Sequence, residues 1–179
     1  MFDAGFPLTL IQHNSVKEKE ILSESVFQFK TSRNIRYIVN VEEYPNYVFV
    51  PKFYPSSEKN NPNRFAVLTF EYNSAKIIRT IIDIMLFVYK ANPMASFAWL
   101  GAATSMKRKR EGKSFTQRYR IYRNLMLNFF SSDNWFHFDD YVTSTYLLAN
   151  KKQQDIDIFL QTVIRMFTDI YPDLERSEL

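Results

Sequence analysis

The densest run of charged side chains lies between residues 107 and 123. It holds eight Lys and Arg residues against one acidic residue, Glu111, so it carries a net charge of +7. The whole chain has a net charge of +4, so the remaining residues carry a net −3. Such a local patch suits the phosphates of a nucleic acid or an acidic protein surface, although a solvated loop can have the same composition. The candidate partner-binding residues are Lys107, Arg108, Lys109, Arg110, Lys113, Arg118, Arg120 and Arg123.

Few residues of this chain could serve as a catalytic nucleophile or hold a metal ion. The sequence has no Cys, and His13 and His137 are its two histidines. Strand alternation would place His137 and Asp139 on one face, but a metal site needs more ligands than this pair supplies. Neither histidine has a serine placed by a Gly-x-Ser-x-Gly motif. We therefore expect neither a metal centre nor a hydrolase triad.

Aromatic residues make up 17% of the chain and glycine occurs three times. So few glycines exclude the phosphate-binding P-loop and the dinucleotide fingerprint, which both need clustered glycines. Phe49, Phe53 and Tyr54, near Lys52 and Arg64, could stack nucleic-acid bases, but alternating aromatics in a strand more commonly face a core. The composition thus favours a large aromatic core.

The first third of the chain predicts antiparallel strands. Residues 35–44 and 47–54 are rich in β-branched and aromatic side chains, and Pro45-Asn46 between them indicates a hairpin. Pro51 places the second strand at a sheet edge or a bulge. Residues 15–22 are charged and mixed, which favours a short surface helix.

The middle of the chain predicts a strand, a helix and a second strand. Residues 64–70 and 96–104 read as strands, and residues 76–90 as a helix capped by Asn73 or Ser74. The helix is apolar around most of its circumference, which predicts that it is covered on several sides. The two strands of such a unit should be parallel.

The last third predicts a helix, a strand and a helix. The first helix begins after Ser114 or Thr116 and ends at Phe130, the strand covers residues 141–149, and the last helix covers residues 153–171. It stays open whether the last helix caps the sheet or joins two copies of the chain as a homodimer.

These elements predict one α/β domain over residues 1–179, with a mixed, mainly antiparallel sheet flanked by helices. Residues 1–11 lack the features of a targeting sequence. The most apolar run, residues 77–89, contains Arg79 and Asp83 and is shorter than the ~20 residues of a membrane span. We expect a cytoplasmic protein of bacterial or phage type that does not bind a membrane.

The order of elements over residues 35–149 resembles the core of the GNAT acetyltransferase superfamily. The resemblance makes residues 64–70 the family's fourth strand and residues 76–90 its third helix. GNAT enzymes bind the pyrophosphate of acetyl-CoA at the start of that helix, with a Gln/Arg-x-x-Gly-x-Gly/Ala loop. The corresponding residues 70–77 (FEYNSAKI) contain no glycine.

The resemblance also implies roles for individual residues. Glu71 would be the general base, Tyr122 or Tyr119 would protonate the departing thiolate, and the start of the helix would hold the cofactor. The implied cofactor-binding residues are Asn73, Ser74 and Lys76.

Two hypotheses of function follow. Residues 70–77 contain no glycine, and the positive charge is concentrated in residues 107–123. The sequence therefore favours a non-catalytic GNAT-like module that needs no cofactor and binds a protein or nucleic-acid partner. The alternative is a divergent N-acyltransferase that uses acetyl-CoA or another acyl-CoA with Glu71 and Tyr122.

Overall fold

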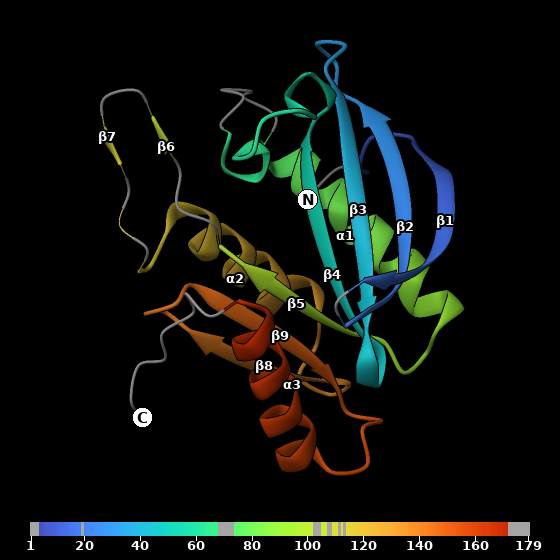
Figure 1. Ribbon diagram of the computed structural model, residues 1–179, viewed down its shortest axis with the longest axis vertical. Helices are drawn as coiled ribbons and strands as arrows, with labels where there is room; N and C mark the ends of the chain where they lie inside the picture. The colour runs from blue at the N-terminus through green and yellow to red at the C-terminus, as the bar shows by residue number, and fades with distance from the viewer. Residues whose placement is uncertain are drawn as a thin grey trace.

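A seven-stranded sheet runs through the computed structural model (Figure 1), which describes residues 4–18, 20–67, 74–101, 105–106, 109–110, 112 and 114–171. The strands follow the order β1-β2-β3-β4-β5-β9-β8, and β6 and β7 form a separate two-stranded ladder. All neighbours are antiparallel except β4 and β5, so the predicted mixed, mainly antiparallel sheet is confirmed. The strands are β1 (Leu8–Glu18), β2 (Ile21–Lys30), β3 (Arg36–Tyr44), β4 (Val48–Pro55), β5 (Ser96–Leu100), β6 (Ser105–Met106), β7 (Lys109–Arg110), β8 (Trp135–Asp140) and β9 (Thr145–Asn150). The α-helices are α1 (Ser74–Ala91), α2 (Gln117–Phe129) and α3 (Ile156–Ile170).

The first hairpin, β1 and β2, replaces the surface helix predicted at residues 15–22. Ser15 lies opposite Ser23 and Glu18 lies opposite Ile21, so this segment is extended and paired. A short isolated helix is marginal in water, whereas pairing with β2 satisfies a whole row of backbone groups.

The predicted β3–β4 hairpin is confirmed. Its turn is a short 3-10 segment, Pro45–Tyr47, in which Asn46 and Tyr47 adopt positive φ angles of 63° and 59°. Pro51 lies opposite Val41 of β3. β4 lies between β3 and β5 and is not the edge strand that was predicted, but it pairs with β5 only at Val48 and Phe49, so Pro51 lies beyond the residues that pair on that side.

Strands β4 and β5 form the parallel pair, connected through α1. They pair only at Val48 with Ser96 and Phe49 with Phe97, and beyond these residues they diverge (Figure 1). The strand predicted at residues 64–70 is wrong where the structure describes it, since Arg64–Ala66 forms a 3-10 helix and residues 68–70 lie outside the described residues. β4 therefore takes the place in the parallel unit that the sequence assigned to residues 64–70.

The sheet has two cores. One face packs against α1 and α2, and its core contains residues such as Ile82, Phe97 and Tyr119. The other face is covered by α3 through Phe159 and Val163, so the last helix caps the sheet. Helix α1 is less enclosed than predicted, because Phe87 keeps 51% of its surface exposed. No helix among the described residues is long and apolar enough to cross a membrane.

The C-terminal third contains one strand more than predicted. The strand expected at residues 141–149 is confirmed as β9 from Thr145 on, whereas residues 141–144 form the turn that joins it to the additional strand β8 and ends at Ser144, whose φ is 55°. Helix α2 begins after Thr116, whose hydroxyl accepts a hydrogen bond from the backbone N–H of Tyr119. This cap is one of the two that the sequence offered.

Candidate functional site

The basic run at residues 107–123 extends from the segment before α2 into the helix itself. Lys107, Arg108 and Lys113 lie outside the described residues, and Lys109 and Arg110 form β7, of which the backbone alone is described. The remaining three candidate partner-binding residues lie on α2. Arg120 and Arg123 line a groove, whereas Arg118 does not.

Arg118 has a structural role. Its guanidinium donates hydrogen bonds to the carbonyl oxygens of Phe65 and Val67, the latter over 2.7 Å. These contacts tie α2 to the segment that follows β4. Arg118 therefore bonds within the protein, whereas Arg120 and Arg123 line a space that a ligand can enter, with Arg123 paired to Asp139 there.

The groove lies between α2 and the end of β8, and we call it the α2–β8 groove. Its volume is about 370 Å³, which falls in the range of small-ligand sites. It is open to solvent on one side. The lining residues are Phe115, Tyr119, Arg120, Arg123, Asn124, Asp139 and Tyr141.

Asp139 connects the two walls of the groove. Its Oδ2 accepts hydrogen bonds of 2.6 Å from the Tyr119 hydroxyl and 2.6 Å from Arg123 Nε. Burial acts to raise the pKa of Asp139, but these two bonds outweigh it and hold the pKa below its ordinary value. Burial and the bond to Asp139 raise the pKa of Tyr119. At neutral pH the groove thus contains a carboxylate, a neutral phenol and a guanidinium in contact.

Two aromatic rings flank the arginines and face solvent. Phe115 and Tyr141 keep 54% and 64% of their surfaces exposed, respectively. Phe115 has a φ of 50°, an unfavourable conformation for a residue with a side chain, and its N–H donates to the Tyr141 carbonyl over 2.7 Å. The guanidinium of Arg120 lies 5.5 Å from the centre of the Phe115 ring. Large exposed rings beside cations are typical of surfaces that stack nucleic-acid bases.

His137 lies near the groove but does not line it. Its Nε2 donates to the Phe130 carbonyl over 3.0 Å, so its Nδ1 accepts the hydrogen bond of 2.6 Å from the Tyr146 hydroxyl. Burial lowers the pKa of His137 and keeps the ring neutral. Within the described part of the chain, no three His, Asp or Glu side chains come together as metal ligands.

The residues that the resemblance assigned to acyl-CoA chemistry are not assembled into a site among the described residues. Glu71 and Asn73 lie outside that part of the chain. Ser74 begins α1, and the ammonium of Lys76 lies 4.7 Å from the centre of the Phe6 ring. Tyr122 is buried in the core, where burial raises its pKa and its ring packs against Phe53. Tyr122 therefore acts as a core residue in this structure.

The other aromatic candidates are also committed to the interior. Phe49 and Tyr54 are buried, and the Arg64 guanidinium stacks 5.1 Å from the centre of the Tyr54 ring. These residues do not form the open stacking platform that the sequence left as an alternative.

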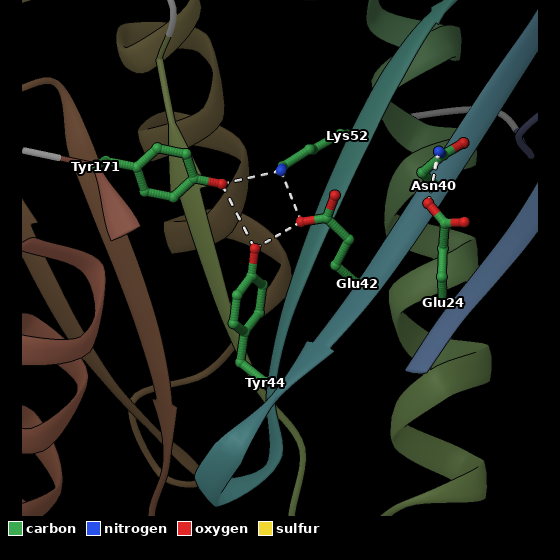
Figure 2. Close-up of polar contacts among 6 residues, drawn as sticks. All are labelled: Glu24, Asn40, Glu42, Tyr44, Lys52 and Tyr171. Carbon is green, nitrogen blue, oxygen red and sulfur yellow. Dashed lines mark hydrogen bonds and ion pairs between the residues drawn. The ribbon is translucent and has the colours of Figure 1, made fainter. Parts of the chain in front are cut away.

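A polar cluster lies on the sheet face that α3 covers (Figure 2). Lys52 Nζ lies 2.6 Å from Glu42 and donates to the Tyr171 hydroxyl over 3.0 Å, while the Tyr44 hydroxyl donates to Glu42 over 2.7 Å. Burial acts to lower the pKa of Lys52, but Glu42 outweighs it and raises the pKa. The Lys52 and Glu42 charges are paired within the cluster, so it fastens the end of α3 to β3 and β4.

Sequence reasoning missed the central contact of the groove. Asp139 was considered as a metal ligand and Tyr119 as a proton donor to a thiolate, although the structure joins them to each other. Phe115 and Tyr141 gave no pattern in the sequence, because single aromatic residues in turns follow no periodicity.

Comparison with known proteins finds no family model, no curated protein and no solved structure that matches the chain.

Proposed function

We propose that this chain is a GNAT-like binding module that recognises nucleic acid through the α2–β8 groove and the basic segment before it. One observation carries the proposal. Arg120 and Arg123 line a groove whose rim presents the exposed rings of Phe115 and Tyr141. Arginines attract the phosphate backbone and exposed rings stack on bases, and proteins that bind single strands combine these two features.

The charge distribution supports the same partner. The net charge of +7 lies in residues 107–123, so cations lie both in α2 and in the segment directly before it. These positive charges would also attract an acidic protein surface. The solvent-exposed rings favour nucleic acid, because an unpaired base offers a flat face to each of them.

The strand order supports the GNAT resemblance in the proposal. Antiparallel strands lead to β4, a helix connects β4 to the parallel β5, and a helix and a terminal hairpin follow. This is the succession on which the resemblance rests, with β4 in the place expected for residues 64–70. A fold does not determine an activity, so the function rests on the groove.

The acyltransferase alternative has weaker support. The observation that favours an acyltransferase is that β4 and β5 diverge at their carboxyl ends, where ligands of α/β sheets commonly bind. Against it, Phe53 packs on Tyr122 and Arg118 bonds to the carbonyls of Phe65 and Val67, so side chains of the protein occupy the region around Tyr122.

Fluorescence anisotropy with a labelled 20-nucleotide DNA of mixed sequence tests the proposed function. We expect the single strand to bind more tightly than its duplex, with an affinity that falls linearly on a logarithmic salt scale. Absence of binding to either form at 50 mM salt would overturn nucleic-acid recognition. Capture of an acidic protein in the same buffer would then assign the patch to a protein partner.

A further inference from the structure

Asp139 has a hydrogen-bonding atom that no described residue uses. Both bonds from Tyr119 and Arg123 end on its Oδ2, and Oδ1 has no hydrogen-bond partner among the described residues. Asp139 also lines the groove. A carboxylate oxygen accepts hydrogen bonds and cannot donate them, so Oδ1 is suited to an N–H group of a ligand.

The carboxylate is compatible with an anionic ligand because Arg123 compensates its charge. The two groups are in contact at 2.6 Å. Arg120 also lines the groove, and its guanidinium lies against the Phe115 ring rather than against a carboxylate of a described residue. A phosphate can therefore approach Arg120 without meeting an unpaired negative charge at Asp139.

The exposed rings of Phe115 and Tyr141 determine which chemical groups of a ligand can reach Asp139. Phe115 lies 5.8 Å from Tyr119, centre to centre, and Tyr141 lines the same space. A flat base stacked on an exposed ring at this rim can turn one edge toward the carboxylate. The groove of about 370 Å³ is open enough for an unpaired nucleotide, whereas the edges of a base in a duplex are already paired.

From this geometry we propose that the α2–β8 groove binds one unpaired nucleotide of a single strand and that Asp139 selects bases with an exocyclic amino group. This inference rests on the proposed function and adds its substrate preference. The amino group of cytosine, adenine or guanine donates to Oδ1, while Phe115 or Tyr141 stacks on the ring and Arg120 attracts a phosphate. Thymine and uracil present carbonyl oxygens on both sides of their one ring N–H, and the carboxylate repels these oxygens.

Competition between labelled dC12 and dT12 at pH 7.5 tests the selectivity without any variant. Both are pyrimidine strands of equal charge, and they differ in the amino group. We expect the wild-type protein to bind dC12 about tenfold more tightly, the effect of one charge-assisted hydrogen bond. Equal affinity for the two strands would overturn the selectivity and leave nucleic-acid binding intact. Failure to bind either strand would overturn both.

Asp139→Asn assigns the preference to this residue. The substitution keeps the shape of the side chain and removes its charge, and we expect the ratio of the two affinities to fall close to one. Asp169→Asn is the matched control, because Asp169 is an exposed residue of α3 far along the chain from the groove, and it should keep the ratio. A ratio that stays near ten in Asp139→Asn, with an unchanged circular dichroism spectrum, would overturn the role of Asp139.

Discussion

The Tyr119 hydroxyl donates a hydrogen bond of 2.6 Å to Asp139 and so joins helix α2 to strand β8. Tyr119 is buried, whereas the Asp139 side chain is about one-third exposed at 31%. The hydrogen bond therefore joins a buried residue of the core to a residue that lines the groove. It links the stability of the domain to the geometry of its candidate binding surface.

Removal of this hydroxyl should destabilise the protein. We expect Tyr119→Phe to lower the free energy of unfolding by about 1 kcal/mol, less than is usual for a bond to a charged group, because solvent screens Asp139. Urea denaturation followed by circular dichroism measures the change. Tyr141→Phe serves as the control, since Tyr141 is exposed and its hydroxyl makes no hydrogen bond to a described residue. Equal stability of the two variants would contradict a structural role of the Tyr119–Asp139 bond.

Gly101 should not tolerate a side chain. A Cβ at this position would lie 2.7 Å from the Tyr119 Cβ and 2.8 Å from the Thr116 hydroxyl oxygen, both at the start of α2. We expect Gly101→Ala to cost about 1–3 kcal/mol, the usual range for overpacking. Gly112→Ala is the matched control, because no described residue lies within 4 Å of the position that a Cβ would take there. Thermal unfolding of both variants measures the difference, and an unchanged melting temperature for Gly101→Ala would show that α2 is not packed so closely.

His137 should make the stability depend on pH. Burial lowers its pKa in the folded state below the ordinary value of 6.5, so the unfolded chain takes up a proton first as the pH falls. In the window below 6.5 the unfolded state binds more protons, and the free energy of unfolding therefore decreases until the folded ring is protonated too. Urea midpoints between pH 8 and 5 should fall more in the wild type than in His137→Gln. Parallel curves for the two proteins would exclude this role of His137.

The hydroxyl of Tyr122 should be dispensable for folding and for nucleic-acid binding. It makes no hydrogen bond to a described residue, and burial disfavours its ionised form. We expect Tyr122→Phe to change the free energy of unfolding by less than about 0.5 kcal/mol, because no partner is lost. Isothermal titration with acetyl-CoA provides the opposing test. Micromolar binding by the wild type together with turnover that collapses in Tyr122→Phe would favour the acyltransferase alternative.

Most elements could be predicted because periodicity and capping are local. Helix α2 begins at Thr116, one of the two caps that the sequence offered, and α3 follows its apolar spacing to Ile170. The errors arose where contacts outside the segment itself decide its structure. Residues 64–66 have the composition of a strand, yet Arg118 of α2 binds the carbonyls of Phe65 and Val67, and residues 15–18 are extended because they pair with β2.

The candidate site was harder to predict than the fold. Basic residues on α2 were found because charge is visible in composition, and the structure separates Arg118 from Arg120 and Arg123 through their partners. The pairing of Tyr119 with Asp139 joins residues 20 positions apart, across the end of α2 and the loop that leads into β8. No spacing rule in a single sequence indicates such a contact.

Binding of a labelled single-stranded DNA to Arg120→Glu and Arg165→Glu tests nucleic-acid recognition by the groove most directly. Both substitutions reverse one exposed charge, the first in the groove and the second on α3. We predict that Arg120→Glu weakens the affinity by about tenfold or more, because a phosphate contact becomes a repulsion, and that Arg165→Glu changes it by less than about twofold. Equal losses in the two variants, or unchanged binding by Arg120→Glu, would contradict recognition at the α2–β8 groove.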